Sequence, residues 1–239
     1  MLTVLKKGLI RLLESRGYCV SFGEPATFAG ILQAFSSKRD KFFFVQIGAY
    51  DGRESDPIQA FIQQRRWGGI VVEPQPDAFE RLRRNYAGRP DLIFENVAIA
   101  DREGSLPLYR LGDEFAYLFK GDHRMLSSFD PEHVIKHLTK QVDTREVLQS
   151  IQVRCLTLSG LLAKYGVRKL DLLQIDAERS DYKILKMVDF ANIKPEIICF
   201  EHAHLSAVEK GECIQLLVLQ NYKVMTARYD MIAFQSRWM

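Results

Sequence analysis

The sequence predicts an α/β fold built on a mainly parallel sheet with helices on both faces. Short apolar runs alternate with stretches of helical periodicity, the order expected for β-α-β units. Two runs, Leu170–Ile175 and Glu196–Phe200, are largely apolar, as expected for strands that helices cover on both sides. The last two runs, Tyr222–Ala227 and Met231–Gln235, have so short a connection that they must pair antiparallel.

The N-terminal residues predict a helical extension, residues 1–40, before a domain at 41–239. Leucines recur at helical spacing in residues 1–20, and charged residues interrupt them too often for a signal peptide or a membrane span. We expect an amphipathic helix packed on its own domain, with a helix on a membrane surface as the alternative.

The remaining elements follow in order along the domain. Strands are predicted at Phe42–Ile47, Gly69–Val72, Leu92–Glu95 and Val97–Ile99, and helices at Pro57–Arg66, Pro76–Tyr86, Asp181–Val188 and Ser206–Leu219. The alternation lapses in residues 104–154, where strands at Gly104–Arg110 and Ile151–Arg154 and a helix at Pro131–Leu138 surround a stretch without period. We expect this part to be an irregular insert that covers the substrate side.

Composition and charge narrow the function classes. The 239 residues carry 33 Lys and Arg against 30 Asp and Glu, a formal charge of +3, so bulk attraction to nucleic acid is disfavoured. The four cysteines lie far apart, which argues against a zinc ribbon or a disulfide framework and fits a reducing cytoplasm.

Two motifs predict an adenosine-containing ligand. The first strand runs into a glycine turn from Gly48 to Gly52, where backbone N–H groups can approach a ligand. Glu73 ends the second strand 25 positions after Gly48, where a carboxylate can hold ribose hydroxyls, although it could instead cap the following helix. The turn lacks the G-x-G-x-x-G and P-loop patterns and carries Asp51, so phosphates are disfavoured and a ligand with ammonium and sulfonium groups is favoured.

Four ordered motifs resemble the FkbM family of S-adenosylmethionine-dependent methyltransferases over residues 42–200. They are the segments Val45–Gly52, Val72–Pro74, Asn96–Ala100 and Asp171–Glu178. The resemblance implies a Rossmann-like class I methyltransferase fold, whose seven-stranded sheet has the order 3-2-1-4-5-7-6 with an antiparallel seventh strand.

The resemblance also implies the cofactor site. The methionine part would lie at the glycine turn, the ribose at Glu73 and the adenine at residues 96–98. The expected cofactor-binding residues are Gln46, Gly48, Ala49, Asp51, Gly52, Glu73, Pro74, Asn96, Val97, Ala98, Ser128 and Asp176. For Asn96 and Ser128, ordinary turn chemistry is the alternative.

The second half carries the candidates for catalysis. Asp176 ends a strand at the ligand-binding edge, where it could hold the cofactor's ammonium or position an acceptor hydroxyl. His202 follows the next strand and is the expected general base, because an imidazole titrates near neutrality. The expected substrate-binding residues are Glu178, Arg179, Glu201 and His204. The family's acidic motif usually continues with glycine where this chain has Arg179, and an acid such as Glu178 could simply favour a helix N-terminus.

A divalent metal is a rival use of these side chains, but no ligand spacing supports it. His133 and His137 are four residues apart without the glutamate of H-E-x-x-H, so we predict a solvated helix face and no metal site.

The sequence therefore predicts an S-adenosylmethionine-dependent enzyme that methylates a hydroxyl on a glycan or small natural product. The alternatives are an N-, RNA- or protein-methyltransferase, or a non-catalytic module that binds an adenosine ligand or a partner. A homo-oligomer is compatible with the sequence.

Overall fold

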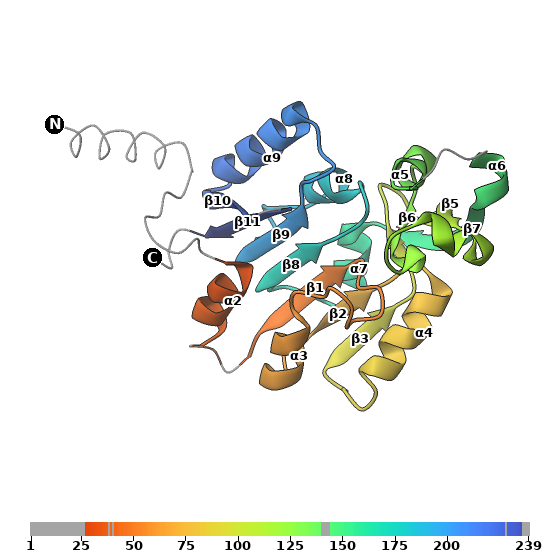
Figure 1. Ribbon diagram of the computed structural model, residues 1–239. Coiled ribbons are helices and arrows are strands. Elements are labelled where there is room, and N and C mark those ends of the chain that lie inside the picture. The colour runs from red at the N-terminus through yellow and green to blue at the C-terminus, as the bar shows by residue number, and fades with distance from the viewer. Residues whose placement is uncertain (1–26, 38, 40, 140–143, 228, 236–239) are drawn as a thin grey trace.

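The computed structural model describes residues 27–37, 39, 41–139, 144–227 and 229–235 (Figure 1). One sheet contains seven strands in the order β10-β11-β9-β8-β1-β2-β3. Their bounds are β1 Phe43–Ile47, β2 Gly68–Val72, β3 Leu92–Glu95, β8 Leu172–Ile175, β9 Ile197–Glu201, β10 Tyr222–Ala227 and β11 Asp230–Gln235. When these seven strands are numbered along the chain and read from β3, the order is 3-2-1-4-5-7-6, which confirms the predicted fold.

The strand directions follow from the connections. β1 is parallel to β2 and β8, β2 is parallel to β3, and β8 is parallel to β9, because helices return the chain to the same end of the sheet. β11 is antiparallel to β10, as the short connection between them predicts, and it is also antiparallel to β9.

Helices cover both faces of this sheet, and the alternation of side chains along each strand decides which residues meet them. Phe44 of β1 belongs to the cluster on one face, with α2 (Phe28–Ser36), α3 (Gln59–Arg65) and α4 (Pro76–Asn85). Val45 and Ile47 belong to the cluster on the other face. That face is covered by α7 (Leu158–Lys164), α8 (Asp181–Lys186) and α9 (Ala207–Leu219).

Residues 98–156 form a second, four-stranded sheet in the order β4-β7-β5-β6. The strands are β4 Ala98–Ile99, β5 Gly104–Leu111, β6 Ser127–Ser128 and β7 Leu148–Leu156. β5 and β7 pair antiparallel along the whole of β5, which confirms the strands predicted at Gly104–Arg110 and Ile151–Arg154. Leu108 of β5 and Val153 of β7 belong to one buried apolar cluster, which helps to hold the two strands together.

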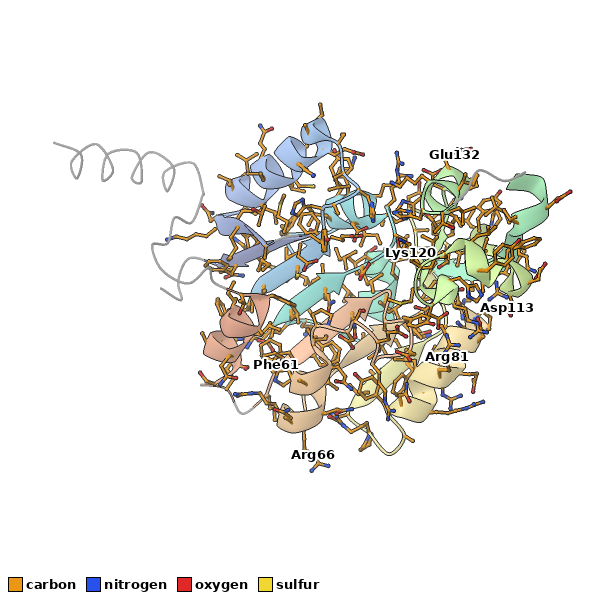
Figure 2. All side chains as sticks on the ribbon, viewed as in Figure 1. Phe61, Arg66, Arg81, Asp113, Lys120 and Glu132 are labelled. Atoms are coloured by element: carbon orange, nitrogen blue, oxygen red, sulfur yellow. The ribbon has the colours of Figure 1, made fainter. Side chains whose placement is uncertain are left out.

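Short helices complete this part, and Figure 1 shows it to one side of the seven-stranded sheet. They are the 3-10 helices η1 (Asp113–Leu118) and η2 (His123–Met125) and the α-helices α5 (Pro131–Lys136) and α6 (Thr144–Val147). Its link to α4 is polar. Arg110 Nη1 of β5 lies 3.1 Å from Asp77 Oδ1 of α4. Figure 2 labels Asp113, Lys120 and Glu132 in this part and Arg81 in α4.

The predicted helix in residues 1–20 lies outside the described residues. Helix α2 falls within the predicted extension, and its Phe28, Ile31 and Leu32 pack into the cluster that contains Phe44. Among the residues described, no helix has the length and apolar character needed to cross a membrane.

Candidate active site

The carboxyl ends of β1 and β8 meet at the point where the chain leaves the sheet toward opposite faces. Gly48 follows β1, and its N–H donates to the carbonyl of Val72 over 3.0 Å. Asp176 follows β8, and its N–H donates to the carbonyl of Ile47 over 2.9 Å. Gly48 has a φ of +79°, and a Cβ there would lie 1.7 Å from the carbonyl oxygen of Asp176. Only glycine allows this close approach.

A pocket opens at this edge, between the seven-stranded sheet and the second sheet. Both sheets and the loops beside them contribute residues to its lining. The lining consists of Ile47, Gly48, Tyr50, Val72, Glu73, Pro74, Gln75, Val97, Ala98, Ile99, Leu108, Met125, Ser127, Ser128, Phe129, Asp176, Ala177, Glu178 and Ser180. The ionisable side chains in this lining include three carboxylates, on Glu73, Asp176 and Glu178, but no lysine, arginine or histidine of the described chain. A pocket with this charge suits a cationic ligand better than a phosphate.

Glu73 is buried and held by the backbone. Its Oε2 accepts the N–H of Tyr50 over 2.8 Å, and its Oε1 accepts the N–H of Gln75 over 2.9 Å. Burial raises the pKa of Glu73 to about 7. A carboxylate has more lone pairs than these two bonds use, so Glu73 can also accept hydroxyl groups from a ligand. Gln75, the residue before α4, makes no capping bond with its side chain.

Carboxylates crowd the far side of the pocket. The side chain of Asp176 is accessible from the pocket, and protein atoms surround the pocket on its other sides. Burial there, followed by the charges of Asp181 and Glu178, raises the pKa of Asp176 well above its usual range. Asp181 is itself buried, and burial raises its pKa to about 7. In addition, Glu201 of β9 lies opposite Asp230 of β11. This edge therefore gathers more carboxyl groups than the net charge of +3 indicates.

Several residues predicted for the cofactor lie outside the pocket lining. Gln46 is buried between Val45 and Ile47, so its side chain points to the opposite face of the sheet. Ala49 is buried with the cluster of that face. Asp51 Oδ1 accepts the N–H groups of Arg53 and Glu54, both over 2.9 Å, and closes the turn.

Two more of these residues shape the pocket from behind. A Cβ on Gly52 would lie 2.4 Å from the ring of Tyr86, so the glycine lets the turn pack on α4. Asn96 Nδ2 donates to the carbonyls of Glu73 and Pro74, over 2.8 and 3.1 Å. Asn96 thus holds the segment that carries Glu73. Gly48, Glu73, Pro74, Val97, Ala98, Ser128 and Asp176 do line the pocket.

The residues predicted for the substrate and for catalysis are spread more widely. Glu178 lines the pocket, and its carbonyl accepts the Ser128 hydroxyl over 2.7 Å. Arg179 lies outside the lining, with its Nε 3.4 Å from Asp130 Oδ2. Glu178 and Arg179 have φ values of 43° and 81°, a conformation that favours glycine.

His202 and its neighbours also lie outside the lining. Both ring nitrogens of His202 are buried without a hydrogen-bond partner, and burial, with the charge of Lys210, lowers the pKa of His202. His204 Nε2 lies 3.1 Å from Glu201 Oε2, and this contact raises the pKa of His204.

Sequence reasoning missed the pocket residues Tyr50 and Gln75 and the apolar side chains Leu108 and Met125. The last two come from the second sheet and its connections, where no motif marked them. The prediction for His133 is wrong, because His133 is fully buried and its Nε2 lies 2.7 Å from Glu178 Oε2. Long-range packing of α5 against the region after β8 buries this residue.

The sheet order and the position of the pocket at its carboxyl edge are those of the Rossmann-like fold of class I methyltransferases. The sequence profile described as "Methyltransferase FkbM domain" matches residues 46–224. The chain belongs to this family.

Solved structures are similar at low identity, and no curated protein sequence matches the chain. A methyltransferase FkbM from Methylobacillus flagellatus KT is 12% identical with a TM-score of 0.48, and the match covers 83% of this chain but 45% of that one. A precorrin-6y C5,15-methyltransferase from Geobacter metallireducens GS-15 is 12% identical with a TM-score of 0.45, over 90% and 94% of the two chains. An RNA methyltransferase from Salinibacter ruber, in complex with S-adenosyl-L-homocysteine, is 13% identical with a TM-score of 0.37, over 90% and 92%.

Proposed function

We propose that the protein is an S-adenosylmethionine-dependent methyltransferase that acts on a hydroxyl oxygen of a glycan or another small acceptor. The observation that carries this proposal is the acidic pocket beside Gly48, at the carboxyl ends of β1, β2 and β8. The cofactor supplies an activated methyl group on a sulfonium centre. Its ammonium and sulfonium charges match a pocket lined by three carboxylates and, among the described residues, by no basic side chain.

Different residues of the pocket bind the ribose, the ammonium group and the adenine of the cofactor. Glu73 accepts the ribose hydroxyls with the lone pairs that Tyr50 and Gln75 leave free. Asp176, at the end of β8, accepts the ammonium group, which relieves the repulsion from the neighbouring carboxylates. Val97, Ala98 and Ile99 form an apolar wall for the adenine.

The acceptor would enter from the side of the second sheet. Leu108, Met125 and Phe129 give that side of the pocket an apolar surface. The absence of a basic side chain from the described lining disfavours a polyphosphate or nucleic-acid acceptor at this site. The choice of a glycan or natural product rests on the family resemblance, and His202 stays a prediction for the general base. The described cysteines Cys155, Cys199 and Cys213 are free and buried, which supports the expected cytoplasmic location.

Isothermal titration with S-adenosylmethionine and S-adenosylhomocysteine tests the cofactor first. We expect binding to both, and Asp176→Asn should weaken it at least about tenfold, the loss expected for one charge-assisted hydrogen bond. Asp101→Asn is the matched control, because Asp101 is exposed and lies outside the pocket lining. Absence of binding by the unchanged protein would refute the proposal.

Turnover is then measured as S-adenosylhomocysteine released with a panel of hydroxyl-bearing sugars and small natural products. Product with these acceptors is the expected result. Cofactor binding without turnover on any of them would favour a non-catalytic module, and methylation of amines or RNA alone would overturn the choice of a hydroxyl oxygen.

A further inference from the structure

Three of the five histidines of the chain meet beside the pocket. His133 and His137 belong to α5 and its end, and His204 follows β9. The ring centres of His133 and His204 are 4.5 Å apart, those of His137 and His204 are 5.1 Å apart, and those of His133 and His137 are 4.7 Å apart. One nitrogen from each ring lies within 4.8 Å of the other two. We call these three side chains the histidine cluster.

Each histidine of the cluster has one ring nitrogen engaged by an oxygen. His133 Nε2 lies 2.7 Å from Glu178 Oε2, and His204 Nε2 lies 3.1 Å from Glu201 Oε2. His137 Nδ1 lies 2.8 Å from the carbonyl oxygen of His133. Metal-binding histidines show this pattern, because a carboxylate or carbonyl on one nitrogen orients the ring and leaves the other nitrogen for the ion.

The second nitrogen is unused in the most buried member of the cluster. His133 is fully buried, and its Nδ1 has no hydrogen-bond partner. A buried polar atom without a partner costs free energy, so such an atom calls for a ligand or another explanation. A metal ion would satisfy it.

The charges around the cluster favour a cation. Glu178, Glu201 and His204 also bring one ligand atom each within 4.8 Å of one another, so two carboxylates border the histidine cluster.

We propose that His133, His137 and His204 bind one divalent transition-metal ion, with zinc as the best match, while Glu178 and Glu201 orient two of the rings. Three imidazoles suit zinc and related ions better than magnesium or calcium, which prefer oxygen ligands. Three protein ligands also leave a coordination position for water or substrate.

Glu178 connects this site to the pocket, because it lines the pocket and contacts His133. If the proposed function holds, the open position of the ion is available to an oxygen of the acceptor. This role rests on the proposed function, whereas the binding of the ion does not.

The test uses the full chain without a histidine tag, after a chelator has removed metal. Titration with Zn²⁺ should give one ion per chain with a dissociation constant below about 1 μM, and Mg²⁺ should not compete. Co²⁺ should give the visible absorption of a site with nitrogen ligands. His137→Gln and His204→Gln should each weaken Zn²⁺ binding at least about 100-fold, because each removes a ligand.

His123→Gln is the matched control, because His123 is a buried histidine that contacts Asp113 instead of the cluster. Circular dichroism and thermal melting of each variant verify that it folds. Zn²⁺ binding that is absent, or that falls equally in His123→Gln and His137→Gln, would overturn the proposal. S-adenosylmethionine titration runs in parallel, so that loss of the zinc site and loss of the cofactor site are separate results.

Discussion

Replacement of Gly48 by alanine tests whether the close approach of β1 and β8 builds the pocket. Gly48 and Gly88 have nearly the same φ, +79° and +81°. A Cβ on Gly48 would lie 1.7 Å from the carbonyl oxygen of Asp176, whereas nothing lies within 4 Å of a Cβ on Gly88. Gly88→Ala therefore measures the backbone penalty alone, and Gly48→Ala adds the clash.

The magnitudes follow from these contacts. The left-handed conformation costs an alanine about 1–2 kcal/mol at either position. At Gly48 the strand ends must also separate, which disrupts the bonds Gly48 N–H to Val72 and Asp176 N–H to Ile47. At about 1 kcal/mol for each bond, Gly48→Ala should lower the free energy of unfolding by roughly 2 kcal/mol more than Gly88→Ala.

Urea denaturation of both variants gives the difference directly. In a chain of this size, 2 kcal/mol corresponds to a shift of about 4–8 °C in Tm. Only Gly48→Ala should also weaken S-adenosylmethionine binding, because Gly48 lines the pocket and Gly88 does not. Equal stability of the two variants, with equal cofactor affinity, would refute this account of the strand junction.

Three further predictions concern the carboxylates and the strained turn. Glu73 has a pKa of about 7 in the folded protein, above the ordinary 4.5, so the folded state holds this proton more tightly. The free energy of unfolding should therefore fall as the pH rises from about 4.5 to 7, by up to about 3 kcal/mol from this group, and Glu73→Gln should remove that part in urea titrations at pH 5 and pH 8. If the free energy of unfolding depended on pH equally in Glu73→Gln and in the unchanged protein, the raised pKa of Glu73 would be contradicted. Asp176→Asn should leave Tm equal or higher while it weakens cofactor binding, because it removes a charge that its neighbours repel; a large fall in Tm would show that the carboxylate stabilises the fold. Arg179→Gly should be more stable than Arg179→Ala by about 1 kcal/mol in urea denaturation, because both lose the exposed contact with Asp130 and only glycine relieves the positive φ. Equal stability would show that this turn carries no backbone penalty.

The parallel core of the fold could be predicted because each of its strands carries its own signal. β2 and β9 are short apolar runs, and the two-residue connection between β10 and β11 allows only antiparallel pairing. The second sheet gave a weaker signal. β5 includes Pro107 and exposes Gly104 and Ser105, so its partnership with β7 depends on contacts between residues far apart in the chain.

In the candidate site, too, some residues could be predicted from the sequence and others could not. Gly48, Glu73 and Asp176 could be found because each follows a strand, and the ends of parallel strands share one edge. Gln46 belongs to the same motif, but strand alternation puts it on the face opposite to Val45 and Ile47. The role of His133 could not be read from the sequence, because its contact with Glu178 joins residues 45 positions apart.

The balance of charge at the pocket explains why net charge alone is a poor guide to this protein's ligands. The chain as a whole is slightly basic, yet the described pocket lining holds three carboxylates and no basic side chain. The negative charges of Asp181, Glu201 and Asp230, on neighbouring elements, also repel the charge of Asp176. Such crowding raises the pKa values of the carboxyl groups, and a bound cation would favour their charged form. One cation is supplied by the proposed cofactor at Asp176, and a second, at the histidine cluster, would offset the charges of Glu178 and Glu201.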